Sequence, residues 1–76
     1  MRMRWENMTA GEIIEALSKA PKDYKVYNGC GSYDFITGIV LDVNTDSIIF
    51  VNNYIINEYL VEPERYKILG HGEEEK

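Results

Sequence analysis

Apolar residues near the start of the chain recur at the spacing of a helix. They occupy i, i+3, i+4 and i+7 positions, which place them on one face: Ala10, Ile13, Ile14 and Leu17. Thr9 and Glu12 have the spacing of a capping box at the start of this segment. Pro21 disfavours the helical conformation at the residue before it. The pattern therefore predicts a helix over about residues 10–20.

Later segments show the alternation of apolar and polar residues that is typical of strands. Three strands are predicted, over residues 24–28, 35–43 and 48–53, and the polar link between the last two predicts a hairpin. The next segment, residues 54–69, is ambiguous, because its apolar residues fit a helical stripe while its Tyr, Ile and Val content favours a strand. We expect β structure in part of it, with a turn at residues 63–66 and a last short strand after that turn.

These elements predict an α+β fold in which one N-terminal helix packs on a small antiparallel sheet of three to five strands. A single short helix covers only one face of such a sheet. By alternation the opposite face carries an apolar strip: Ile36, Val40, Ile49 and Val51. We expect residues 54–69 or a second copy of the chain to cover this strip. An exposed apolar face normally marks an interface, so we predict a homo-oligomer, in the first place a dimer.

The length of 76 residues predicts a single domain. Residues 1–7 match no element and are predicted to form an N-terminal arm, which is either frayed or holds Trp5 as a docking anchor. Residues 8–70 form the predicted α+β domain, and residues 71–76 a flexible acidic tail.

The composition limits the classes of partner. The formal net charge is −5 at pH 7, which argues against binding to the phosphate backbone of nucleic acids. No apolar run reaches the ~18 residues of a membrane span, so no membrane partner is expected. Cys30 is the only cysteine and cannot form an internal disulfide, which is consistent with a reducing compartment. We therefore predict a cytoplasmic protein.

The residues that could carry chemistry form no recognisable catalytic set. A reactive thiol at Cys30 needs a cation or a base beside it, and His71 is the only histidine. The glycines around Cys30 suggest a phosphate-binding loop, yet they lead to a strand rather than to the start of a helix. Three aspartates lack metal-ligand spacing: Asp34, Asp42 and Asp46. We predict no enzymatic activity, no metal and no cofactor.

Tyrosine is the most distinctive component, with six copies beside one tryptophan. Such side chains bury an apolar ring and keep the hydroxyl in water, so ordinary packing on a sheet explains them. The alternative is an aromatic surface that binds another protein or, through stacking, a nucleotide base. The candidate binding residues are Trp5, Tyr27, Asn28, Cys30, Tyr33, Tyr54 and Tyr59.

The predicted helix and the segment after it resemble a loose set of small phage and prophage proteins. Proteins of this set begin with a Thr-x-x-Glu-Leu/Ile-Ile-x-x-Leu helix, pass through a Leu-Pro or Ala-Pro turn with an acidic residue, and enter a strand. The resemblance covers about residues 8–53 and leaves out residues 1–7 and the segment after Asn53. The matching residues are Thr9, Glu12, Ile13, Ile14, Leu17, Ala20, Pro21 and Asp23, followed by Lys25, Val26 and Tyr27.

The resemblance implies a small accessory protein of a mobile element. Our leading hypothesis is a non-catalytic phage or prophage protein that binds a host protein, with inhibition of a host defence component as its most specific form. The alternative is a protein that sequesters a nucleotide-type signal at a subunit interface, through residues 28–33 and the tyrosines. An enzyme built on Cys30 ranks third.

Overall fold

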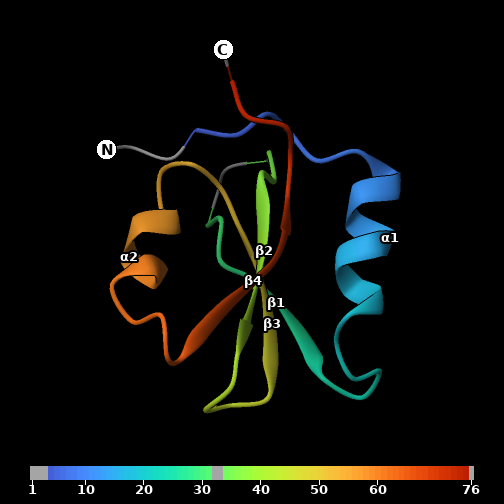
Figure 1. Cartoon of the computed structure of the whole chain (residues 1–76), viewed down its shortest axis with the longest axis vertical. Coiled ribbons are helices and arrows are strands. Elements are labelled where there is room, and N and C mark those ends of the chain that lie inside the picture. The colour runs from blue at the N-terminus through green and yellow to red at the C-terminus, as the bar shows by residue number, and fades with distance from the viewer. Residues whose placement is uncertain (1–3, 32–33, 76) are drawn as a thin grey trace.

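The structure is a computed structural model that describes residues 4–31 and 34–75. Its elements follow one another in the order α1 (Ala10–Ser18), β1 (Lys25–Asn28), β2 (Gly38–Asp42), β3 (Ser47–Val51), α2 (Ile56–Leu60) and β4 (Tyr66–His71). The four strands form one sheet in the spatial order β1-β3-β2-β4, and the two helices lie on opposite sides of it (Figure 1). The predicted α+β fold with its N-terminal helix is confirmed.

The sheet is mixed, whereas the sequence predicted an antiparallel one. β2 is antiparallel to both of its neighbours, β3 and β4. β1, however, runs parallel to β3. β1 and β2 follow each other along the chain but are not neighbours in the sheet, because β3 lies between them. The second strand of the β2–β3 hairpin, and not the first, therefore lies beside β1.

The predicted capping box starts α1. The Thr9 hydroxyl accepts a hydrogen bond from the backbone N–H of Glu12 at 3.2 Å, and the Glu12 carboxylate accepts one from the Thr9 N–H at 2.7 Å. The buried centre of the helix is Ala16, and a Cβ on Gly70 would come within 2.8 Å of the Ala16 Cβ. Small residues at both positions thus let α1 lie close to β4. Ile14 was predicted on the buried face but is 70% exposed, because the buried stripe centres on Ala16.

A hydrophobic cluster fills each face of the sheet. On the side of α1, the buried members are Ala16, Ile39 and Ile48. On the side of α2, the buried members are Trp5, Val40, Val51 and Ile56, with Ile49 packed against them. The prediction that residues 54–69 cover the second face is confirmed, with helix at α2 and strand only at β4. Because α2 supplies this cover, the argument that led from an uncovered strip to a dimer no longer applies.

The two ends of the described chain pair with each other. The Glu6 N–H donates to the carbonyl of Glu73 at 2.7 Å, and Trp5 lies opposite Glu74 in an isolated antiparallel bridge. The Asn53 side chain holds the backbone of Trp5, since it accepts from the Trp5 N–H at 3.0 Å and donates to the Trp5 carbonyl at 2.8 Å. Trp5 is only 2% exposed and belongs to the hydrophobic cluster on the side of α2.

These contacts move the predicted domain boundaries. β4 continues through His71, and Gly72 is buried, so residues 71–75 pack on the domain instead of forming a separate tail. Residues 4–7 of the predicted arm do the same. The acidic side chains led to the prediction of a solvated tail, but pairing between backbones does not depend on side-chain charge. Residues 1–3 and 76 lie outside the described residues.

Gly72→Ala tests whether this pairing stabilises the fold. A Cβ at this position would overlap the carbonyl oxygen of Glu6, so the N-terminal segment would have to move away. We expect the free energy of unfolding, measured by urea denaturation, to fall by about 1–2 kcal/mol, the lower part of the usual cost of overpacking. Gly11→Ala is the matched control, because a Cβ there meets nothing closer than 4.0 Å. A loss no larger than that of the control would contradict the pairing of the two ends.

Candidate functional site

A shallow groove lies beside β1, on the face of the sheet that α2 covers. Its volume is about 410 Å³. We name it the tyrosine groove, and its lining residues are Tyr27, Asn28, Gly29, Thr45, Ser47, Ile49 and Tyr59. The structure thus brings together three of the candidates from the sequence: Tyr27, Asn28 and Tyr59.

Strand pairing directs Tyr27 into this groove. Tyr27 lies opposite Ile49 in the β1–β3 register, and paired residues share one face of a sheet. Ile49 packs against the cluster on the side of α2, which fixes the face for Tyr27 as well. All four residues of β1 are exposed, and Tyr27 keeps 54% of its surface in solvent. Its ring is therefore accessible to a partner.

α2 contributes Tyr59 to the lining of the groove. The Tyr59 ring packs edge-on against that of Tyr66, with the centroids 4.8 Å apart and the planes at 86°. Gly29 leaves space for Tyr59 and Ile49, because a Cβ at this position would come within 3.2 Å of the Tyr59 hydroxyl and 2.7 Å of Ile49. Burial raises the pKa of Tyr59, so its hydroxyl stays protonated near neutral pH and can donate a hydrogen bond.

The remaining candidate binding residues do not join this groove. Trp5 and Cys30 are each 2% exposed, so neither presents its side chain to a partner. Tyr54 is exposed, but it packs edge-on against Phe35 with the ring centroids 5.7 Å apart, outside the tyrosine groove. Tyr33 lies outside the described residues.

The two residues considered for catalysis lie far apart. Cys30 follows β1 and His71 ends β4, and these strands are the opposite edges of the sheet. Three strand spacings, or roughly 14 Å, separate them. The Cys30 thiol donates to the Phe50 carbonyl at 3.5 Å, and burial raises the pKa of this thiol. Both effects favour the protonated form, which is the unreactive one.

Among the described residues, no group of three or more His, Cys, Asp or Glu side chains is placed to hold a metal ion. Two of the three aspartates noted in the sequence have partners within the chain. Asp42 accepts two hydrogen bonds of 3.1 Å each from the guanidinium of Arg65. Asp46 accepts one of 3.0 Å from the hydroxyl of Tyr24. These carboxylates therefore tie neighbouring segments to the β2–β3 hairpin.

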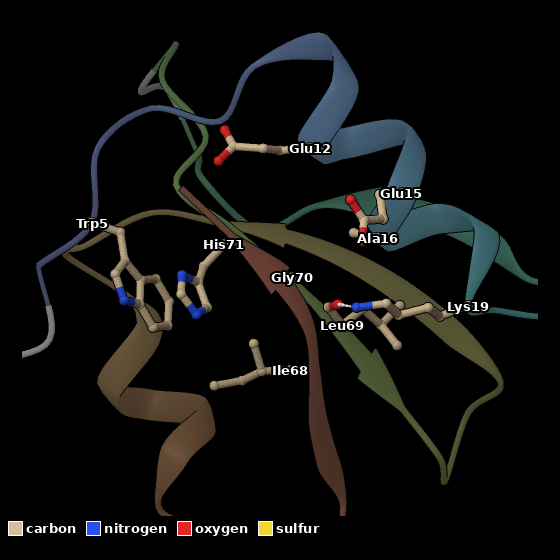
Figure 2. A pocket seen from close by; sticks show the side chains of 9 residues that line it. All are labelled: Trp5, Glu12, Glu15, Ala16, Lys19, Ile68, Leu69, Gly70 and His71. Carbon is tan, nitrogen blue, oxygen red and sulfur yellow. Dashed lines mark hydrogen bonds between the residues drawn. The ribbon is translucent and has the colours of Figure 1, made fainter. Parts of the chain in front are cut away.

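A second groove, of about 580 Å³, follows the outer edge of β4 beside α1 (Figure 2). His71 stacks on Trp5 at one end, with the ring centroids 4.2 Å apart and the planes 9° from parallel. From α1, Lys19 donates to the Leu69 carbonyl at 3.0 Å, the dashed line in Figure 2. The Glu12 carboxylate already caps α1. Glu12, Lys19 and His71 thus all have contacts within the chain, whereas the tyrosine groove combines two tyrosine rings with an edge strand, so we place the candidate site there.

Sequence reasoning missed four residues of the tyrosine groove. Ile49 was assigned to the correct face by alternation, but its place beside β1 depends on the parallel pairing. Thr45 and Ser47 come from the hairpin link and the start of β3, which reach β1 only in the folded sheet. Gly29 was assigned to a turn and considered in a phosphate-binding loop, and both of its neighbours, Asn28 and Cys30, were candidate binding residues.

Comparisons with known proteins found no match. No protein-family model matches the chain, and neither a curated protein nor a solved structure does. The resemblance to phage and prophage proteins therefore stays a prediction. Over the two described ranges, no helix has the length and apolar character needed to cross a membrane.

Proposed function

We propose that the protein is a non-catalytic protein-binding module and that the tyrosine groove receives an apolar side chain of its partner. The observation that carries this proposal is that an exposed Tyr27 and a half-buried Tyr59 line one groove beside an edge strand. Tyrosine is enriched at protein interfaces, because its ring supplies apolar area and its hydroxyl a hydrogen bond. Ile49 adds apolar surface to the same lining.

The lining of the groove supports binding rather than catalysis. Its described residues carry phenol, amide, hydroxyl and apolar groups, and none of them is a carboxylate, an imidazole or an amine. The lining therefore gives Ser47 and Thr45 no general base that could activate them. A nucleotide-type ligand would need cations for its phosphates, and the lining supplies none. A protein partner accounts better for this chemistry.

We further propose that the chain is an accessory protein of a phage or prophage and that its partner is a protein of the host cytoplasm. The resemblance of residues 8–53 to such proteins supports this proposal. Binding would inhibit the partner where the groove covers one of the partner's own contact surfaces. A host defence component is the class of target that we propose.

Thr45→Arg tests the role of the groove. Thr45 is exposed at the groove, on the link between β2 and β3, so a larger cationic side chain there would obstruct the groove without replacing a sheet residue. Wild type and variant are immobilised in equal amounts, incubated with host lysate, and the bound proteins are identified by mass spectrometry. We expect one specific host protein to bind wild type and its affinity for the variant, measured by calorimetry, to fall at least tenfold, or about 1.4 kcal/mol.

Val61→Arg is the matched control, because Val61 is 75% exposed and lies outside the groove. This variant should bind the host protein as wild type does. Recovery of no specific protein, or equal affinity for Thr45→Arg, would refute the proposed role of the groove. Stabilisation by a nucleotide in a thermal-shift screen, lost in Thr45→Arg, would support the small-molecule hypothesis instead.

A further inference from the structure

β1 is an edge strand, and its outer edge, on the side away from β3, presents a few backbone N–H and C=O groups. In a strand, the backbone groups of successive residues point to opposite sides. The Gly29 N–H donates to the Phe50 carbonyl of β3 at 2.9 Å, so Gly29, and by alternation Tyr27, directs its backbone groups toward β3. The N–H and C=O groups of Val26 and Asn28 therefore point outward, away from the sheet.

This outward set is limited on both sides by hydrogen bonds within the chain. The Tyr24 N–H donates to the Pro21 carbonyl at 3.3 Å, and the Cys30 N–H donates to the side-chain oxygen of Asn28 at 2.9 Å. Among the described residues, no backbone hydrogen bond outside the sheet involves Val26 or Asn28, so two donors and two acceptors remain on these two residues. Each face of the strand also presents an exposed apolar side chain, Val26 on the side of α1 and Tyr27 on the side of α2.

The opposite edge of the sheet is protected against pairing. The β2–β4 register shifts between Ile39 and Val40, which is typical of a bulge. Lys19 covers the Leu69 carbonyl of the same edge strand with a hydrogen bond of 3.0 Å. Bulges and lysines are features by which proteins keep an edge strand from pairing. β1, in contrast, keeps a regular register with β3.

We propose that β1 pairs in an antiparallel way with β1 of a second copy of this chain, about a two-fold axis at Tyr27. In this register Val26 lies opposite Asn28 of the partner subunit, and Asn28 lies opposite the partner subunit's Val26. All four outward donors and acceptors are then used in two hydrogen-bonded pairs. A register centred on Val26 would instead place Asn28 opposite Tyr24 of the partner subunit, whose N–H is already bonded to Pro21.

Charge and size support this self-pairing. Lys25 would lie opposite Gly29 of the partner subunit, so no like charges face each other across the axis. A domain of 76 residues buries only a modest share of its unfolded surface, and association adds to that share. The contact is isologous, since the same two residues donate and accept on both sides.

The dimer joins the two tyrosine grooves. Tyr27 and the partner subunit's Tyr27 form a non-hydrogen-bonded pair at the axis, with their Cα atoms about 4.5 Å apart. The axis is perpendicular to the sheet, so both rings lie on the α2 side and the grooves form one surface. The biological role of this surface rests on the proposed function, while the pairing of β1 does not.

Single cysteines placed along β1 test the register. In Tyr27→Cys the two thiols face each other at a Cα separation that suits a disulfide. We expect mild oxidation to convert most of the 8.8 kDa chain to a covalent dimer on a non-reducing gel. Lys25→Cys is the matched control on the same face, and its two copies would be several residues apart along the strands. Val26→Cys tests the alternative register, because a two-fold axis at Val26 would bring the two thiols of this variant together. The buried Cys30 is common to all variants.

Tyr27→Lys measures the same contact at equilibrium. It places two like charges opposite each other, so we expect dimerisation in sedimentation equilibrium to weaken at least tenfold. Val61→Lys, with equal charge, should dimerise like wild type. Cross-linking of Lys25→Cys or Val26→Cys as fast as that of Tyr27→Cys would overturn the inference. So would a chain that sediments at 8.8 kDa at every concentration up to about 1 mM.

Thr45→Arg separates this inference from the proposed function, because Thr45 lies on the β3 side of β1. The variant should dimerise like wild type. An intact dimer that binds no host protein would refute the proposed function alone, and a strictly monomeric chain that binds its host protein would refute this inference alone.

Discussion

Replacing Trp5 with alanine should lower the free energy of unfolding by about 3–5 kcal/mol, the usual cost of truncating a buried tryptophan. Trp5 belongs to the cluster on the side of α2, and its ring stacks on that of His71. A chain of 76 residues has a total stability of roughly 4–11 kcal/mol, so this one change removes a large part of it. Urea denaturation followed by far-ultraviolet circular dichroism measures the loss, because the variant lacks the only tryptophan.

Tyr54→Ala is the control for Trp5→Ala. It removes another large aromatic ring, but one that is 61% exposed, so its cost should stay near or below about 1 kcal/mol. Trp5→Phe should fall between the two, since a smaller ring fills part of the site. If Trp5→Ala cost no more than Tyr54→Ala, residues 4–7 would be the frayed arm, one of the two alternatives that the sequence left open.

Elements with local determinants were predictable from the sequence, and long-range pairings were not. The capping box at Thr9 and the proline at position 21 lie within the segment that they delimit, so α1 could be placed closely. The parallel pairing of β1 with β3 depends on how the link before β2 crosses the sheet, which has no local signature. Trp5 has no periodic neighbours, and its burial depends on Asn53 and on residues 73–75, far along the chain.

Residue type alone identified part of the candidate site. Tyr27, Asn28 and Tyr59 were chosen for aromatic chemistry and position near a turn, and the fold places all three at one groove. Trp5 and Tyr54 were chosen for the same chemistry, but residue type does not determine burial or position in the sheet. The fold buries Trp5 and places Tyr54 outside the groove.

Asp42 and Arg65 form an ion pair that fastens the β2–β3 hairpin to the turn before β4. The side chain of Asp42 is 5% exposed, and it accepts from Arg65 at 3.1 Å and from the Asn44 N–H at 3.0 Å. The Val43 N–H adds a hydrogen bond of 3.0 Å to the Arg65 carbonyl. The sequence offered no sign of this pair, because its members are 23 positions apart. The hydrogen bonds from Arg65 hold the pKa of Asp42 below its usual value, and burial opposes them only in part.

Asp42→Asn should therefore lower the free energy of unfolding by about 1.5–3 kcal/mol near neutral pH, the range for hydrogen bonds to a charged group. The variant loses the carboxylate charge and leaves Arg65 without its counter-ion. Glu75→Gln is the matched control, because it breaks the 2.9 Å ion pair with Arg4, whose two side chains are 58% and 39% exposed. Surface pairs of this kind contribute little, so we expect no measurable loss. An equal loss in both variants would contradict the special role of the buried pair.

The effect of Asp42→Asn should also depend on pH, with a sign that follows from the lowered pKa. An unfolded aspartate has a pKa of about 3.9. Because the folded pKa of Asp42 lies below that value, its ionised form stabilises the fold fully above the unfolded pKa, and this stabilisation is lost as the pH falls through the folded pKa. The stability difference between wild type and variant should be complete at about pH 6–7 and should shrink from about pH 4 downward. Urea denaturation at each pH measures it. A difference that stayed constant down to about pH 2 would show that Asp42 acts through its shape rather than its charge.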